Sequence, residues 1–478
     1  MLKRIITFST SYAIIEALQK GIMFFLMSLF TYYMTTEEYG IISSALMIIQ
    51  FLAIIFSLSA TASISRYYYK YANEPEKLKE FLGTSFLFLF LTCLMFLGVF
   101  ILFGEPLFTW IFPELPFNPY LIWIFLICVL QPFNMAYLAL LKAQQKLKRY
   151  TYLYSIFYVL QFALMGITII QKGMKHDGYI LSLLLSNLFF IVIILLFLLK
   201  EVRFVLKREF ISESFHYSIS YLPTELLATI NIIVDRFYIL ALLTLSALGV
   251  YQIAIQMGAI LVLIFRALNY AYLPHFMSIY ESGKKDYGEI YRFANFYVLI
   301  AVVLTGYASI LSPYFIKYVL DESYIAAKDV VVYINFTYAF SSIYFINVNI
   351  MSLTPKLVRV KTLFIFIGGM VNLGLNFILI KQYGLVGAAL ATLMGIFITN
   401  VLLVYGVKKK TNFEFKSLKN LLYILFSFLL TFLLMKISLG NEVLEAMVMM
   451  IVFSISSILL FCLIHQKHPM EILKVKLK

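Results

Sequence analysis

The residues best able to do chemistry are six ionisable side chains that fall deep inside apolar stretches of the sequence. A charged group at the centre of a membrane helix costs about 3 kcal/mol, so a chain that keeps several must give them partners or water. We therefore predict that they line a polar central cavity that binds the substrate. The six are Glu16, Lys20, Glu225, Asp235, Arg236 and Arg266.

Two pairs among the six also have structural explanations. Glu16 and Lys20 are four residues apart, so on a helix they share one face and could neutralise each other. Asp235 and Arg236 are adjacent and point about 100° apart, so each needs another partner. A bridge between helices would explain this second pair as well as a binding role does.

Arg66 is the seventh predicted site residue. The six deeper charges cancel in sign, so if the cargo is a pyrophosphate, additional positive charge must come from the mouths of the cavity, where Arg66 is the best candidate. It precedes three consecutive tyrosines, Tyr67, Tyr68 and Tyr69. Such rings can stack on sugars, but tyrosines also anchor helices at the membrane interface, and both readings fit this position.

The remaining reactive residue types predict no metal site and no cofactor. The three cysteines lie in apolar runs without metal-ligand spacing, and the five histidines are scattered. No phosphate-binding loop of the GxxxxGK[ST] type occurs, which argues against ATP as the direct driver. An H⁺ or Na⁺ gradient, acting through Glu16, Glu225 or Asp235, is the alternative energy source.

The composition predicts that membrane-spanning helices position these residues. The 478-residue chain has a mean hydropathy of +0.92 and only 13% charged residues, about half the average for soluble proteins. Apolar runs of roughly twenty residues, the length that spans a bilayer, predict about fourteen transmembrane helices and an all-α integral membrane fold. The predicted spans are 6–33, 41–64, 81–104, 119–141, 151–171, 179–199, 217–242, 247–271, 292–316, 329–352, 362–381, 385–407, 418–438 and 443–464.

The distribution of basic residues predicts the orientation. About three quarters of the 38 lysines and arginines fall in alternate loops and the two tails. By the positive-inside rule, both termini are cytoplasmic. The same bias explains the net charge of +14 without a nucleic-acid partner.

A weak internal repeat predicts the domain organisation. Glu16 and Gly40 recur 209 positions later as Glu225 and Gly249. A parallel repeat of this kind is typical of transporters with two similar halves. We predict an N-terminal lobe at 1–204, a C-terminal lobe at 205–410, and two additional helices with a cytoplasmic tail at 411–478.

Several motifs resemble one family. They are Glu38-Tyr39-Gly40, Tyr221-Leu222-Pro223 followed by Val234-Asp235-Arg236-Phe237, and Gln382-Tyr383-Gly384-Leu385-Val386-Gly387-Ala388-Ala389. Because these motifs occur in the same order, the chain resembles the Wzx-type (O-antigen) flippases of the multidrug/oligosaccharidyl-lipid/polysaccharide exporter superfamily. The resemblance covers residues 1–410.

This resemblance implies two six-helix lobes around a central cavity, an alternating-access cycle and no enzymatic activity. The implied cargo is an undecaprenyl-pyrophosphate-linked oligosaccharide, moved across a bacterial inner membrane. The implied partners are membrane lipid and the polysaccharide polymerase machinery.

The sequence is also compatible with two other functions. A small-molecule or drug:cation antiporter of the same superfamily would share the fold, although such antiporters usually have twelve helices. A membrane polysaccharide polymerase or ligase would need a sizeable outer loop, and the predicted outer loops are short.

Overall fold

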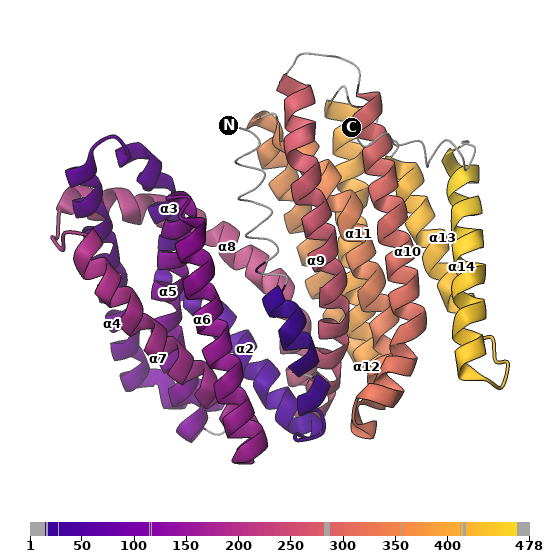
Figure 1. The fold of residues 1–478 in the computed structure, drawn as a ribbon, viewed down its shortest axis with the longest axis horizontal. Coiled ribbons are helices and arrows are strands. Elements are labelled where there is room, and N and C mark those ends of the chain that lie inside the picture. The colour runs from indigo at the N-terminus through magenta and orange to yellow at the C-terminus, as the bar shows by residue number, and fades with distance from the viewer. Residues whose placement is uncertain are drawn as a thin grey trace. The chain divides into compact units, whose positions relative to one another are not determined.

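The computed structural model of the protein describes residues 15, 18–26, 28–113, 115, 117–281, 287–353, 355–411, 413 and 417–465. All regular elements in this part of the chain are helices (Figure 1). They form two compact units. The N-terminal unit holds Tyr33–Leu240 and Thr244–Gly249, and the C-terminal unit holds Met1–Tyr32, Ala241–Leu243 and Val250–Lys478.

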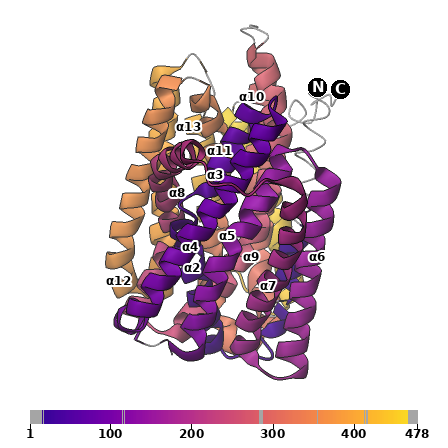
Figure 2. The same ribbon diagram turned by 90° about the vertical axis from the view of Figure 1, so that its left-hand side faces the viewer.

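The N-terminal unit is built around α5, which packs against α2, α3 and α7 (Figure 2). Its helices are α2 (Thr36–Ser57), α3 (Ala60–Tyr71), α4 (Pro75–Ile111), η1 (Phe117–Leu121), α5 (Ile122–Ala143), α6 (Leu147–Met165), η2 (Gly166–Gln171), α7 (Lys175–Glu201) and most of α8 (Arg208–Leu242).

The C-terminal unit is built around α11, which packs against α10, α12 and α13, while α14 packs on α10 and α13. Its helices are the apolar helix Leu18–Phe30, most of α9 (Leu245–Glu281), α10 (Gly288–Val319), η3 (Glu322–Ala327), α11 (Lys328–Ser352), α12 (Pro355–Lys410), α13 (Ser417–Leu434) and α14 (Glu442–His465).

The units exchange helices relative to the lobes predicted at 1–204 and 205–410. The first helix belongs to the C-terminal unit because Phe24 packs on Phe315, with ring centroids 5.4 Å apart, and Thr31 Oγ1 accepts from Asp321 N at 3.3 Å. In turn, α8 as far as Leu240 belongs to the N-terminal unit. The predicted lobes rest on an internal repeat, which packing does not test, so their boundaries stay a prediction.

The predicted all-helical membrane architecture is confirmed. Eleven helices in the described part of the chain are long and apolar enough to cross a membrane. One of these, Lys356–Lys410, covers two predicted spans, and the shorter Leu18–Phe30 lies within the first. Helix α8 covers the predicted span 217–242 but is not among the eleven. The exact number of fourteen stays a prediction.

The predicted span 41–64 is interrupted in the structure. Leu58 and Ser59 both adopt left-handed backbone angles, with φ of 45° and 58°, and separate α2 from α3. Such angles are uncommon for residues other than glycine. Hydrogen bonds compensate for the strain, because Ser57 Oγ accepts from Ser59 N at 3.3 Å and Ser218 Oγ donates to Ser59 O at 3.4 Å.

A reciprocal glycine contact joins the starts of α2 and α9 inside the N-terminal unit. A Cβ atom on Gly40 would lie 1.9 Å from the carbonyl oxygen of Leu245, and one on Gly249 would lie 1.8 Å from that of Thr36. Thr36 and Leu245 are the first residues of their helices and, like the two glycines, are 209 positions apart. The two motifs that suggested a repeat therefore pack on each other.

We predict that Gly40→Ala or Gly249→Ala lowers the stability of the protein by about 1–3 kcal/mol, because a Cβ cannot fit against a backbone carbonyl without separating the helices. Thermal unfolding of the purified protein in detergent measures this. Gly98→Ala is the control, because Gly98 has open space around its Cβ position and alanine favours the helix. Equal melting temperatures for all three variants would contradict the prediction.

Candidate functional site

Helix α8 carries a polar stripe on an exposed face. Ser212, His216, Ser220 and Thr224 follow one another at intervals of four residues, so they lie on one side of the helix, and all four are exposed. Hydrocarbon offers no partner for a hydroxyl or an imidazole. Within the helix, Ser220 Oγ donates to the carbonyl of His216 at 2.7 Å, and the apolar residues Ile219 and Leu227 are exposed on the same side. We interpret this mixed face as one that can meet water or a polar ligand.

A proline increases the polarity of this helix. Pro223 lies inside α8 and has no N–H group, so the carbonyl of Ile219 loses its helical donor. Ile219 is itself 40% exposed. The stripe thus has a backbone acceptor beside its side-chain hydroxyls.

Side chains of α3 contact the first half of α8 and complete the surface. Ser59 at the start of α3 contacts Ser218, while Lys70 and Tyr71 at its end contact Glu213. Between these points the rings of Tyr67 and Tyr217 meet edge to face, with centroids 5.9 Å apart. We call the exposed residues of these two helices the α3–α8 surface.

Glu213 joins the two helices through two hydrogen bonds. Its Oε1 accepts from Lys70 Nζ at 2.5 Å, and its Oε2 accepts from the hydroxyl of Tyr71 at 2.6 Å. The hydrogen bond with Glu213 raises the pKa of Lys70, and burial together with that carboxylate raises the pKa of Tyr71. Lys70 therefore stays charged and Tyr71 stays a hydrogen-bond donor at neutral pH.

One predicted site residue, Arg66, belongs to the α3–α8 surface, and a second, Glu225, is next in sequence to its residue Thr224. Arg66 is exposed on α3, at the level where that helix passes Tyr217, and forms no ion pair in the described part of the chain. Glu225 follows Thr224 and is half-buried. Its Oε2 is buried and accepts no hydrogen bond from the described residues.

Asp235 and Arg236 lie near the other end of α8 and are only 6% and 7% exposed. Asp235 Oδ1 accepts from the backbone N–H of Arg236 at 2.8 Å. A buried position is consistent with a structural role of this pair as a bridge between helices. Its role in substrate binding stays a prediction.

The C-terminal unit holds the other predicted site residues that the structure describes. Lys20 and Arg266 are both exposed, and Glu16 lies outside the described residues. Arg266 precedes Asn269 by one turn of α9, and Asn269 Oδ1 accepts from Asn349 Nδ2 at 2.8 Å. The predicted residues thus divide between two units, and their grouping around one central cavity stays a prediction.

Sequence reasoning missed the polar stripe and Glu213. The search for charges inside apolar runs passed over neutral hydroxyls, although their spacing of four residues was visible in the sequence. Glu213 was overlooked because it precedes the predicted span 217–242. Only the packing of α3 on α8 gives it two partners.

The fold is that of known membrane transporters and flippases. A solved structure titled as the lipid II flippase MurJ in an inward closed conformation matches with a TM-score of 0.64 and 15% identity, covering 92% of this chain and 98% of that one. A mutant of the Vibrio cholerae MATE transporter VcmN matches with a TM-score of 0.56 and 13% identity, covering 85% and 97%. An inward-facing MATE-family multidrug transporter reaches 0.57 at 14% identity, covering 81% and 94%. At these identities the likeness concerns the fold alone.

The family is shown by sequence. The sequence model of the polysaccharide biosynthesis protein family matches residues 9–280, more than half of the chain, so the protein belongs to this family. The resemblance to the multidrug/oligosaccharidyl-lipid/polysaccharide exporter superfamily is thereby confirmed. No curated protein sequence matches the chain.

We predict that Glu213→Ala destabilises the protein by about 1–3 kcal/mol, because the hydroxyl of Tyr71, a residue only 5% exposed, loses its acceptor. Lys70→Ala should have a smaller effect, below about 1 kcal/mol, since its ion pair is exposed. Thermal unfolding in detergent compares the two. Glu76→Ala, which removes another exposed ion pair, is the control and should leave the melting temperature unchanged. An equal effect of Glu213→Ala and Glu76→Ala would refute the shared role of Glu213.

Proposed function

We propose that the protein is a flippase for an undecaprenyl-pyrophosphate-linked oligosaccharide. In this proposal it moves the cargo by alternating access from the cytoplasmic to the outer leaflet of a bacterial inner membrane, for surface polysaccharide assembly. The polysaccharide biosynthesis family supports the cargo class. The observation that carries the proposal is the polar stripe of α8.

The chemistry of the α3–α8 surface suits a sugar phosphate. An oligosaccharide presents many hydroxyls, and serine and threonine hydroxyls can both donate to and accept from them. Arg66 supplies a planar cation, which can bind two phosphate oxygens at once. The tyrosines on both helices offer flat, amphipathic rings beside these groups. Sugar, phosphate and ring contacts are therefore available on one surface.

The physical obstacle is the hydrocarbon core, about 30 Å thick, which a sugar phosphate cannot cross unaided. In the proposed cycle the head group binds the α3–α8 surface while the prenyl tail stays in lipid. One solved structure with this fold is titled a lipid II flippase, so the fold is compatible with moving a lipid-linked head group.

The proposed energy source is an H⁺ or Na⁺ gradient. Glu225 is the candidate coupling residue among those described, because its half-buried carboxylate lies next to Thr224 and has an oxygen without a donor. The proposed partners are the surrounding lipid and the polysaccharide polymerase machinery that would use the flipped product. No enzymatic step is assigned to the protein.

We predict that Thr224→Leu lowers surface polysaccharide about fivefold, the effect of one lost hydroxyl hydrogen bond, without lowering the amount of protein in the membrane. Leucine keeps the helix but makes the stripe apolar. The assay is export in a strain that depends on this chain for its surface polysaccharide. Thr109→Leu is the matched control, because Thr109 is exposed on α4 beside the exposed apolar residues Leu107 and Trp110. Equal export by the two variants would rule out the proposed surface.

We also predict that Arg66→Ala and Arg266→Ala each reduce export about tenfold, since a charge-assisted hydrogen bond contributes about 1.5–3 kcal/mol. Arg359→Ala, which removes an exposed arginine of α12, is the control. Accumulation of lipid-linked oligosaccharide in the inner leaflet would place the defect at transport. Normal export by both variants at normal protein levels would contradict the proposed role of these arginines in binding the phosphate.

A further inference from the structure

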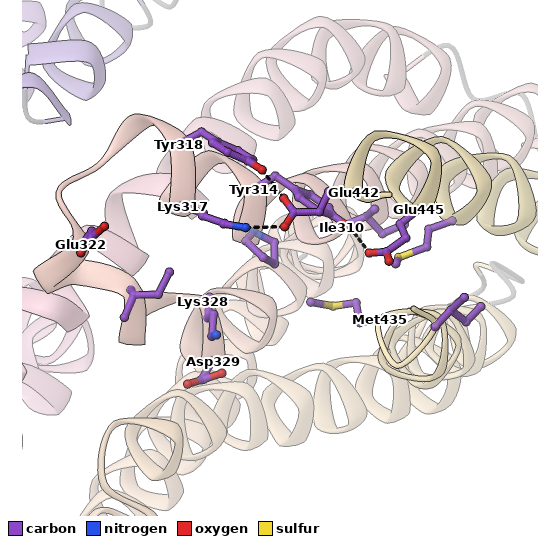
Figure 3. A pocket seen from close by; sticks show the side chains of 14 residues that line it. Ile310, Tyr314, Lys317, Tyr318, Glu322, Lys328, Asp329, Met435, Glu442 and Glu445 are labelled. Atoms are coloured by element: carbon purple, nitrogen blue, oxygen red, sulfur yellow. Dashed lines mark hydrogen bonds and ion pairs between the residues drawn. The ribbon is translucent and has the colours of Figure 1, made fainter. Parts of the chain in front are cut away.

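The C-terminal unit contains a pocket of about 830 Å³ that the proposed function does not use (Figure 3). It lies among the C-terminal end of α10, η3, the start of α11, and the turn that joins α13 to α14. Its volume is within the range of small-molecule sites. Since it lies at helix ends, we infer that it is at the level of lipid head groups rather than of acyl-chain ends.

One wall of this pocket is already satisfied by its own residues. Glu442 forms an ion pair with Lys317 and accepts from the hydroxyl of Tyr318 at 2.5 Å. Glu445 Oε1 accepts from the backbone N–H groups of Leu439 and Gly440, at 2.7 and 3.1 Å. These carboxylates fix the α13–α14 turn to α14 and α14 to α10, so they are not free to bind a ligand.

The opposite wall has unused charge. Glu322 on η3 and Lys328 and Asp329 at the start of α11 line the pocket and are exposed. Their side chains form no ion pair or hydrogen bond within the part of the chain that the structure describes. The available groups are therefore two carboxylates and one ammonium, a pattern that complements a zwitterion with one cation and one anion.

Apolar side chains complete the pocket. Ile310, Pro313, Met435 and Met449 line it together with the charged residues. Val319 and Val443, the sequence neighbours of the lining residues Tyr318 and Glu442, are 41% and 70% exposed, as expected for helix ends surrounded by lipid. A soluble zwitterion would leave these apolar groups unused, whereas an amphiphile would cover them.

We propose that this pocket binds a phospholipid whose head group carries a primary ammonium, as phosphatidylethanolamine does. The ammonium pairs with Asp329 or Glu322, the phosphate accepts from Lys328, and the glycerol and upper acyl chain lie on the apolar residues. A primary ammonium fits better than a quaternary one, because a carboxylate can accept its N–H groups. An anionic lipid without the ammonium would meet two uncompensated carboxylates.

The experiment is native mass spectrometry of the full-length purified protein with phosphatidylethanolamine, phosphatidylglycerol or phosphatidylcholine of identical acyl chains. We expect the protein to retain phosphatidylethanolamine preferentially. The double variant Glu322→Gln/Asp329→Asn should lower the ratio of bound phosphatidylethanolamine to phosphatidylglycerol about fivefold, as expected for exposed ion pairs. Lys328→Gln should weaken binding of both lipids.

The control is Glu37→Gln/Glu209→Gln, which removes two exposed carboxylates from the other unit and should leave the ratio unchanged. The proposal is overturned if the unmodified protein has no preference for phosphatidylethanolamine, or if the Glu322/Asp329 double variant keeps it. It is also overturned if soluble glycerophosphoethanolamine binds as tightly as the lipid, since the pocket would then recognise a head group alone. None of these outcomes depends on the proposed cargo.

Discussion

Hydrocarbon provides no hydrogen-bond partner for a polar side chain, and this constraint explains most of the structure. Most helices of the chain are so apolar that lipid suits their exposed faces. On α4, for instance, Ile101, Leu102 and Trp110 are 73%, 71% and 81% exposed. Helix α8 violates this pattern with its exposed stripe of hydroxyls and an imidazole. We interpret this stripe as a place where water or a polar substrate meets the protein.

Backbone contact is the second constraint, and it connects the fold to the repeat. Two helices approach most closely where neither has a side chain in the way. At the crossing of α2 and α9, each glycine faces the first carbonyl of the other helix. The arrangement is reciprocal, as expected when two copies of one ancestral motif meet. Tyr39-Gly40 and Gly249-Val250-Tyr251 are thus explained by packing, independently of any substrate.

The apolar runs could predict the helices because run length and composition depend only on local sequence. The break at Leu58–Ser59 could not be predicted, since it depends on a hydrogen bond from Ser218, about 160 residues away. The place of the first helix in the C-terminal unit likewise depends on Phe315 and Asp321. For the site, sequence predicted Arg66 and Glu225 as individual charges. The surface that holds them required the pairing of α3 with α8, which no local pattern contains.

The charges of the chain separate into those that are satisfied within the fold and those that are not. Glu213, Glu442 and Glu445 each accept at least two hydrogen bonds and hold helices or turns together. Arg66, Glu322 and Lys328 are exposed and form no such bonds to the residues that the structure describes. A saturated carboxylate has little left to offer a ligand, whereas an unsatisfied charge at a membrane surface keeps its full attraction for one. The charged residues proposed to bind ligands are therefore distinguished from those that build the fold by whether their hydrogen-bonding groups are already used within the protein.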